Sequence, residues 1–137
     1  MKLIGRTIIV TGASGGIGAP LCAALIKAGA RVLAVGRDES KLRPLAQHVP
    51  AGALQWVAAD VATPDGQAHI LEAAKAMRPA PSALVIAHAQ SAFGLFEEQD
   101  PDAMSRLVQT NLIAPMQLIR LLLPMLKMQQ QAAVAVV

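Results

Sequence analysis

Short apolar runs alternate along the chain with segments in which apolar residues recur at helical spacing. The apolar runs, none of which alternates between apolar and polar positions, lie at 7–10, 31–35, 54–58, 82–87 and 132–137. Strands with such continuous apolar sequence are covered on both faces, as in a parallel sheet. The helical segments between them lie at 16–28, 39–48, 63–77 and 100–125. This order predicts right-handed βαβ units and a doubly wound α/β fold, in which helices sandwich a parallel sheet.

Local signals mark the ends of several helices. Thr63–Pro64 and Asp100–Pro101 each combine a capping side chain with a proline suited to the first helical turn. Gly29 is a helix-stop residue after the first helix. Pro44 falls in the middle of the second predicted helix, where its ring and its missing N–H disfavour helical structure.

The length of the chain and its last residues bear on domain organisation. A chain of 137 residues without repeats or linkers suits a single domain that spans 1–137. The fifth apolar run ends the chain with no helix to cover it. We therefore expect an incomplete domain, truncated within the fifth strand.

Composition excludes several classes of function. About 54% of the residues are hydrophobic, 15% are charged, and the net charge of +3 is scattered. The Lys and Arg residues form no run, so the sequence does not indicate a nucleic-acid partner. The apolar stretches are too short to span a membrane or are interrupted by prolines and an arginine. Cys22, the single cysteine, suits a buried thiol in a reducing compartment, and the three histidines are too far apart for a zinc site. We expect a soluble cytoplasmic protein.

A glycine-rich loop follows the first strand and opens the first helix. Its sequence is Thr11-Gly12-Ala13-Ser14-Gly15-Gly16-Ile17-Gly18. Gly12 permits a tight turn, Gly16 lets the backbone approach a pyrophosphate, and Gly18 lets the helix pack closely. The free N–H groups and the positive dipole end of the helix then hold the phosphate. A merely structural turn is the alternative, but the strand before the loop and the helix after it favour a Rossmann-type dinucleotide site.

The Thr-Gly-x-x-x-Gly-x-Gly spacing of residues 11–18 resembles the short-chain dehydrogenase/reductase family. The resemblance continues through Asp60-Val61 after the third strand and Asn111 in the long helix. It implies an oxidoreductase that moves a hydride between a nicotinamide and a carbonyl or alcohol carbon, and it covers about the first half of a typical member.

The end of the second strand bears on the choice of dinucleotide. A carboxylate at this place accepts hydrogen bonds from the ribose 2′-hydroxyl and selects NAD. Gly36 supplies no carboxylate, whereas Arg37 supplies a planar cation suited to the 2′-phosphate of NADP. We therefore predict NADP over NAD, although Asp38 can pair with Arg37 and the glycine loop lacks a second basic residue.

Other cofactor contacts are implied by the resemblance. Asp60 would accept from the adenine amino group beside the Val61 backbone, with a turn-forming aspartate as the alternative. The family's Asn-Asn-Ala-Gly segment aligns with Ala87-His88-Ala89-Gln90, where only Ala89 agrees. This loop would lie beside the nicotinamide ribose. His88 would either bond cofactor or substrate or support the loop.

Asn111 lies within an apolar face of the long helix, so we expect its amide to be at least partly buried. That face consists of Met104, Leu107, Val108, Leu112, Met116, Leu118, Ile119 and Leu122. Pro115 has no N–H for the Asn111 carbonyl, so a kink is expected there. The resemblance implies that Asn111 holds a water in a proton relay, a catalytic role. The alternative is an asparagine that only stabilises a bent helix.

The family's catalytic serine, tyrosine and lysine follow the fifth strand, and this chain has no tyrosine. Residues 1–137 alone are therefore predicted to be inactive. A non-enzymatic dinucleotide-binding or sensor module is the second hypothesis, and a methyltransferase with the same fold is a third that would not need the 11–18 spacing. The excess of apolar residues on the long helix favours a homodimer or homotetramer, with further burial within the chain as the alternative.

Overall fold

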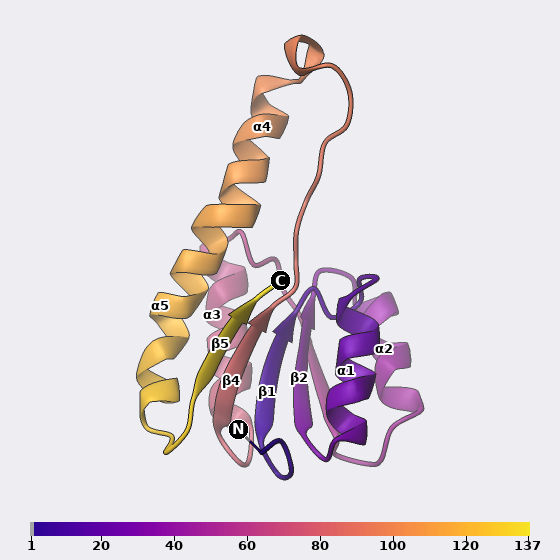
Figure 1. The fold of residues 1–137 in the computed structure, drawn as a ribbon, viewed down its shortest axis with the longest axis vertical. Helices are drawn as coiled ribbons and strands as arrows, with labels where there is room; N and C mark the ends of the chain where they lie inside the picture. The colour runs from indigo at the N-terminus through magenta and orange to yellow at the C-terminus, as the bar shows by residue number, and fades with distance from the viewer. Residues whose placement is uncertain (1) are drawn as a thin grey trace.

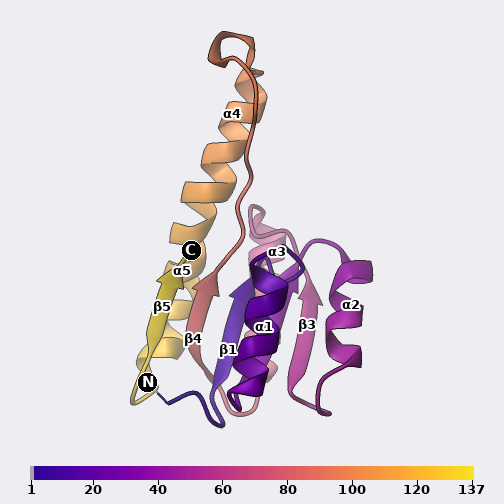
Figure 2. The same cartoon turned by 45° about the vertical axis from the view of Figure 1, so that its right-hand side comes forward.

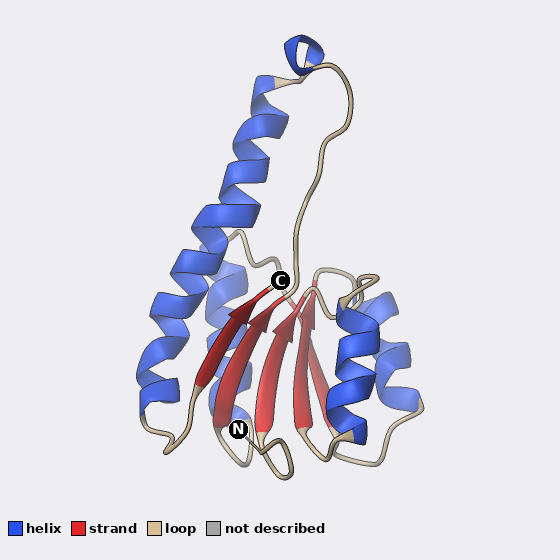
Figure 3. Ribbon diagram, in the orientation of Figure 1, coloured by secondary structure: helices blue, strands red, loops and turns tan. Residues whose placement is uncertain are grey.

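The computed structural model describes residues 2–137, which form a five-stranded sheet in the order β3-β2-β1-β4-β5. Every neighbouring pair is parallel (Figures 1 and 3). The strands are β1 (Thr7–Thr11), β2 (Arg31–Gly36), β3 (Leu54–Ala58), β4 (Pro81–Ile86) and β5 (Ala133–Val136). The predicted strands and the doubly wound parallel fold are confirmed, with ends that differ by one residue.

Helices cover both faces of this sheet (Figure 2). One face packs against α1 (Gly18–Lys27) and α2 (Glu39–Gln47), the other against α3 (Pro64–Ala76) and α5 (Ala114–Lys127). Adjacent residues of β1 enter opposite cores: Ile8 and Val10 pack with α1, whereas Ile9 packs with α3 and α5. Because both faces are buried, the three central residues of the strand are all apolar.

The α2 helix forms despite Pro44, which lies exposed inside it. The N-terminus of the helix is capped by Asp38, whose carboxylate accepts a hydrogen bond from the Ser40 N–H at 2.9 Å. This cap and the burial of Leu42 in the core outweigh the local cost of the proline.

Cys22 is buried on the inner face of α1, as predicted. Burial raises the pKa of its thiol to about 11, so the group stays protonated at neutral pH.

The long helix has three parts: α4 (Pro101–Val108), a π-helical turn (Gln109–Ile113) and α5. In the π turn the Ala114 N–H donates to the Gln109 carbonyl five residues earlier. The irregularity expected from Pro115 therefore takes the form of a π turn just before the proline. Neither this helix nor any other within residues 2–137 is long and apolar enough to cross a membrane.

The predicted apolar face of the long helix is only partly correct. Leu118 and Leu122 are buried against the sheet, but Val108, Leu112 and Met116 are 53%, 55% and 61% exposed. Val108 is exposed because α4 rises beyond the carboxyl edge of the strands, where no sheet lies beneath it (Figure 1). Met116 lies within α5 on the side away from the core, which Ala114, Pro115 and Leu118 enter.

Two neighbouring leucines of α5 test this packing. Leu122 is fully buried and Leu123 is 36% exposed. Leu122→Ala is expected to lower the free energy of unfolding by about 2–5 kcal/mol, because it leaves a cavity in the core. Leu123→Ala is expected to cost less than about 1 kcal/mol. Denaturant unfolding measures both, and equal losses would contradict this account of the core.

Candidate functional site

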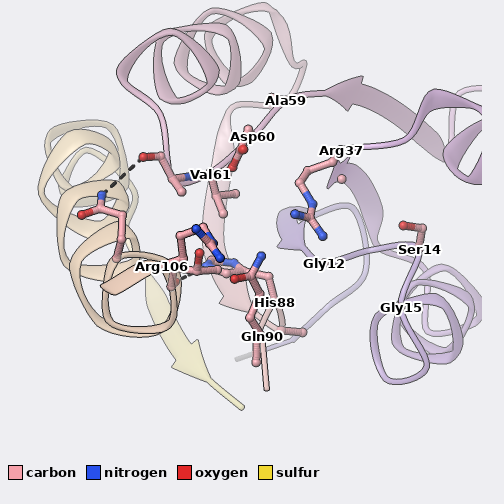
Figure 4. A pocket seen from close by; sticks show the side chains of 16 residues that line it. Gly12, Ser14, Gly15, Arg37, Ala59, Asp60, Val61, His88, Gln90 and Arg106 are labelled. Carbon is pink, nitrogen blue, oxygen red and sulfur yellow. Dashed lines mark hydrogen bonds between the residues drawn. The ribbon is translucent and has the colours of Figure 1, made fainter. Parts of the chain in front are cut away.

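A pocket of about 450 Å³ opens at the carboxyl edge of the sheet (Figure 4). It lies at the ends of the neighbouring strands β1 and β4, where the strand order reverses, since the chain runs from β1 outward through β2 and β3 and then returns to place β4 on the other side of β1. Such a switch in strand order creates a crevice where ligands bind in open α/β sheets. The lining residues are Gly12, Ser14, Gly15, Gly36, Arg37, Ala59, Asp60, Val61, Ala62, Ala87, His88, Ala89, Gln90, Arg106, Gln109 and Thr110.

The glycine loop forms one wall, and its backbone requires glycine at two positions. Gly12 has a φ of +66°, and a Cβ atom there would lie 2.6 Å from the Ala87 carbonyl oxygen. A Cβ on Gly18 would overlap the Gly12 carbonyl. The tight turn predicted at Gly12 is thus present, and Gly18 packs closely against the backbone of the loop at Gly12 and Ala13.

The N-terminus of α1 is open at this wall. Side chains of Asp38, Thr63 and Asp100 cap α2, α3 and α4, but no side chain caps α1. Within residues 2–137, the N–H groups of Gly16 and Ile17 have no acceptor. These amides, with the positive end of the helix dipole, can hold an anion.

The open space around Gly16 matches the same interpretation. No atom lies within 4 Å of the position that a Gly16 Cβ would occupy. Of the other loop amides, Ala13 donates to the Val35 carbonyl and Gly15 to the Gly12 carbonyl. The loop is therefore fixed at its base by its own hydrogen bonds, while its tip is free to contact a ligand.

Arg37 lines the pocket at the end of β2, next to Gly36. A Cβ on Gly36 would lie 3.2 Å from the Ser14 hydroxyl, so this point has little room for a side chain. Arg37 is exposed, and it makes no ion pair within the described part of the chain.

Asp38 does not pair with Arg37. Its carboxylate accepts from the Ser40 hydroxyl at 2.6 Å and from the Ser40 N–H, and it lies 4.0 Å from the Lys41 ammonium. The Ser40 hydroxyl, more than the other contacts, lowers the pKa of Asp38. The competing pairing considered from the sequence is thus absent here, because Asp38 caps α2.

Asp60 follows β3 and faces the pocket from another wall. One carboxylate oxygen accepts from the Ala62 N–H at 2.9 Å, so the residue stabilises its own turn. The Gln109 amide, from the π turn, donates to the Ala62 carbonyl at 3.3 Å and joins this loop to the long helix (Figure 4). The aspartate therefore forms a turn and also lines the pocket with Val61.

The loop after β4 forms the floor. His88 Nδ1 lies 2.7 Å from the Thr11 hydroxyl, and Nε2 lies 3.2 Å from the Thr110 carbonyl. His88 is half-buried, and this burial lowers the pKa of its imidazole, against smaller opposing effects of the Thr110 carbonyl and Asp60. The supporting role considered for His88 has a structural basis in these two contacts.

Asn111 is exposed, so the prediction of a partly buried amide is wrong. It lies in the π turn, where the helix begins to rise beyond the sheet. Its amide nevertheless has partners: Oδ1 accepts from the Gln90 N–H at 2.8 Å, and Nδ2 donates to the Gln90 carbonyl at 2.7 Å. Among the described residues only glycines have positive φ, so Gln90 fits an ordinary backbone conformation where the family has glycine.

The structure gathers most of the predicted site residues around one pocket. Thr11 lies behind the floor, Asn111 beside it, and Gly16 and Ile17 at the helix mouth. Arg106, Gln109 and Thr110 also line the pocket but were missed, because no sequence signal joins a helix surface to loops tens of residues away. Within residues 2–137, no three His, Cys, Asp or Glu side chains come together as a metal site.

Known proteins share both the sequence and the fold. The family model "short chain dehydrogenase" matches residues 6–137. A short chain dehydrogenase of Pseudocercospora fijiensis is 31% identical over 137 residues, which cover 97% of this chain and 44% of that protein. An uncharacterised oxidoreductase of Escherichia coli is 32% identical over 127 residues, covering 88% of this chain and 50% of the relative.

Solved structures give the same result. A 3-ketoacyl-(acyl-carrier-protein) reductase from Brucella melitensis, complexed with NADH, superposes with a TM-score of 0.91 at 26% identity. The match covers 98% of this chain and 57% of that one. A 3-oxoacyl (acyl-carrier-protein) reductase from Agrobacterium tumefaciens with NADP bound gives 0.86 at 26% identity, over 98% and 52%.

The chain thus spans about half the length of the solved structures it matches. A family model that covers residues 6–137, together with the glycine loop and the sheet order, leads to one conclusion. This protein belongs to the short-chain dehydrogenase family.

Proposed function

We propose that this protein is an NADP-dependent oxidoreductase that transfers a hydride between the nicotinamide and a carbonyl or alcohol substrate, with residues 1–137 holding the cofactor. The observation that carries the proposal is the uncapped N-terminus of α1, where the Gly16 and Ile17 amides directly follow Ser14 and Gly15 of the pocket wall. Exposed N–H groups at the N-terminus of a helix are favourable for the negative charge of a pyrophosphate.

Each group of pocket residues can be assigned to one part of a bound dinucleotide. The glycine loop would hold the pyrophosphate, and Arg37 would contact the ribose at the end of β2. Asp60 has one carboxylate oxygen committed to Ala62, and the other would accept from the adenine amino group. The loop of Ala87, His88 and Ala89 would lie beside the nicotinamide ribose. The bound nicotinamide would supply or accept the hydride.

The preference for NADP rests on charge. Gly36 offers no carboxylate to bond a 2′-hydroxyl, and the Arg37 guanidinium has no competing ion pair within residues 2–137. A guanidinium binds a phosphate through two parallel hydrogen bonds, which a ribose hydroxyl cannot match.

Asn111 is proposed to act through its backbone. Its side chain is committed to Gln90, whereas Pro115 has no N–H to offer the Asn111 carbonyl. This carbonyl would hold a water in the proton relay that the family uses. Full turnover would need a serine, a tyrosine and a lysine beyond the residues described here.

The protein is proposed to assemble as a homodimer or homotetramer in the cytoplasm. The support for assembly is the exposed apolar strip of Val108, Leu112 and Met116 on the long helix. A nucleic-acid partner is not proposed.

Arg37→Ala tests the choice of cofactor. The variant is expected to weaken NADP binding by about 10- to 100-fold, as expected for the loss of charge-assisted hydrogen bonds, and NAD binding by less than about 3-fold. Calorimetric titration of the whole protein with each dinucleotide gives both values.

Arg106→Ala is the matched control, because Arg106 lines the same pocket from α4 and tests the effect of positive charge alone. The assignment of Arg37 would be refuted if Arg37→Ala weakened NADP and NAD binding equally. It would also be refuted if Arg106→Ala reduced the preference for NADP over NAD as much as Arg37→Ala does.

Residues 1–137 alone are expected to show no oxidation of NADPH with carbonyl substrates, because the chain has no tyrosine to act as the acid. Absorbance of the reduced nicotinamide measures the rate. Turnover that is lost on mutation of a residue within 1–137 would contradict this expectation.

A further inference from the structure

His88 joins three segments that meet under the pocket. It follows β4, its Nδ1 contacts the Thr11 hydroxyl at the end of β1, and its Nε2 contacts the Thr110 carbonyl in the π turn. These partners lie 77 and 22 residues away in the sequence. Thr11 is completely buried, so its hydroxyl has few alternatives.

The two partners determine which ring nitrogen carries the proton. A carbonyl oxygen only accepts hydrogen bonds, so Nε2 must be protonated to bond Thr110. In the neutral ring Nδ1 is then an acceptor, and the Thr11 hydroxyl donates to it. Protonation of Nδ1 would reverse this bond, because the Nδ1–H would donate to the Thr11 oxygen and the hydroxyl would turn toward its other acceptor, the Val85 carbonyl at 3.5 Å.

Both contacts lie next to residues that shape the pocket. Thr11 precedes Gly12, whose Cα packs against Ala87 and His88. Thr110 precedes Asn111, whose amide bonds both backbone groups of Gln90. A change at His88 would therefore alter the glycine loop and the π turn together.

We propose that His88 is a positioning residue, whose neutral Nε2–H imidazole ties β1 to the π turn and so holds the cofactor pocket in the geometry that binds the dinucleotide. The effect on cofactor affinity rests on the proposed function, whereas the tie itself does not. The tie would affect the affinity for the dinucleotide by fixing the positions of Gly12 and Asn111, and the imidazole would not need to contact the cofactor.

Charges around the imidazole favour no single protonation state strongly. Asp60, after β3, stabilises the cation, and Arg37, after β2, opposes it. Arg106 of α4 lines the same pocket, and the glycine loop and the π turn contribute no ionisable side chain. Burial has the largest effect and lowers the pKa of His88 below its ordinary 6.5.

The lowered pKa gives the tie a defined pH dependence. As the pH falls below 6.5, the unfolded chain binds a proton at His88 before the folded protein does. Proton uptake by the unfolded state lowers stability, so this contribution of His88 is complete above 6.5 and declines at lower pH. His88→Asn lacks that titration.

The test uses the whole protein and three variants. Thr11→Val replaces the hydroxyl donor by a methyl group of similar size, and His88→Asn removes the imidazole. His69→Asn is the matched control, because His69 is exposed on α3 outside the pocket. The melting temperature from pH 5 to 8 and the dissociation constant for NADP are measured for the wild type and for each variant. The ring ¹⁵N shifts of His88 are measured in every protein that retains this histidine.

The expected results are a fixed Nε2–H tautomer at His88, with a changed Nδ1 shift in Thr11→Val because the hydroxyl donor is gone, and an NADP affinity about 3- to 10-fold weaker in Thr11→Val and His88→Asn. The melting-temperature advantage of the wild type over His88→Asn should shrink below pH 6.5, and His69→Asn should behave as wild type in affinity. An Nδ1–H tautomer, or an advantage independent of pH, would overturn the tie.

Affinity within 2-fold of wild type in both pocket variants would overturn the positioning role. A wild-type protein that binds no dinucleotide would instead overturn the proposed function, while the tautomer and the melting temperatures would still decide whether the tie exists.

Discussion

The ends of β1 and β4 meet so closely that the chain has no room for a side chain between them. A Cβ on Gly12 would lie 2.6 Å from the Ala87 carbonyl oxygen and 2.7 Å from the His88 Cα. This contact, together with a φ of +66°, turns the chain sharply out of β1 and directs it under the start of α1. The open helix mouth, the pocket and the tie at His88 all depend on that turn.

The carboxyl edge of the sheet concentrates groups that the core could not accept. The ends of the strands, the N-terminus of α1 and the side chains of Arg37, Asp60 and His88 lie at this edge. Most residues of β1, β2 and β4 below them are buried, and the central residues of these strands are apolar. Rigid strands therefore hold polar groups in place without packing them into the core.

Much of the fold followed from pattern alone, because strands buried on both faces need continuous apolar runs. The burial of Ile8, Ile9 and Val10 in two opposed cores shows this directly. The exposure of Asn111 was not predictable from helical periodicity, since periodicity does not reveal where the sheet beneath a helix ends. The helix predicted at 39–48 forms with Pro44 inside it, with a capping carboxylate at Asp38 and a buried leucine at 42.

The parts of the site that are formed by residues close together in the sequence were predictable. The parts formed by residues far apart in the sequence were not. The glycine loop and Arg37 each lie within one strand–loop–helix unit. Gln109 contacts Ala62, 47 residues away in the sequence. Arg106 and Thr110 line the pocket only because α4 and the π turn lie beside it. Only the folded chain brings these together.

The function proposed for this protein requires that the backbone N–H groups of Gly16 and Ile17, at the N-terminus of α1, bind a pyrophosphate. The most direct measurement is a ¹H–¹⁵N NMR titration of the whole protein with NADP, followed at the backbone amides. The account predicts saturable shifts that are largest at Gly16 and Ile17 and small at Ser40 and Gly66, whose amides are already bonded to capping side chains. Saturation with no shift at Gly16 and Ile17, or no binding at all, would contradict it.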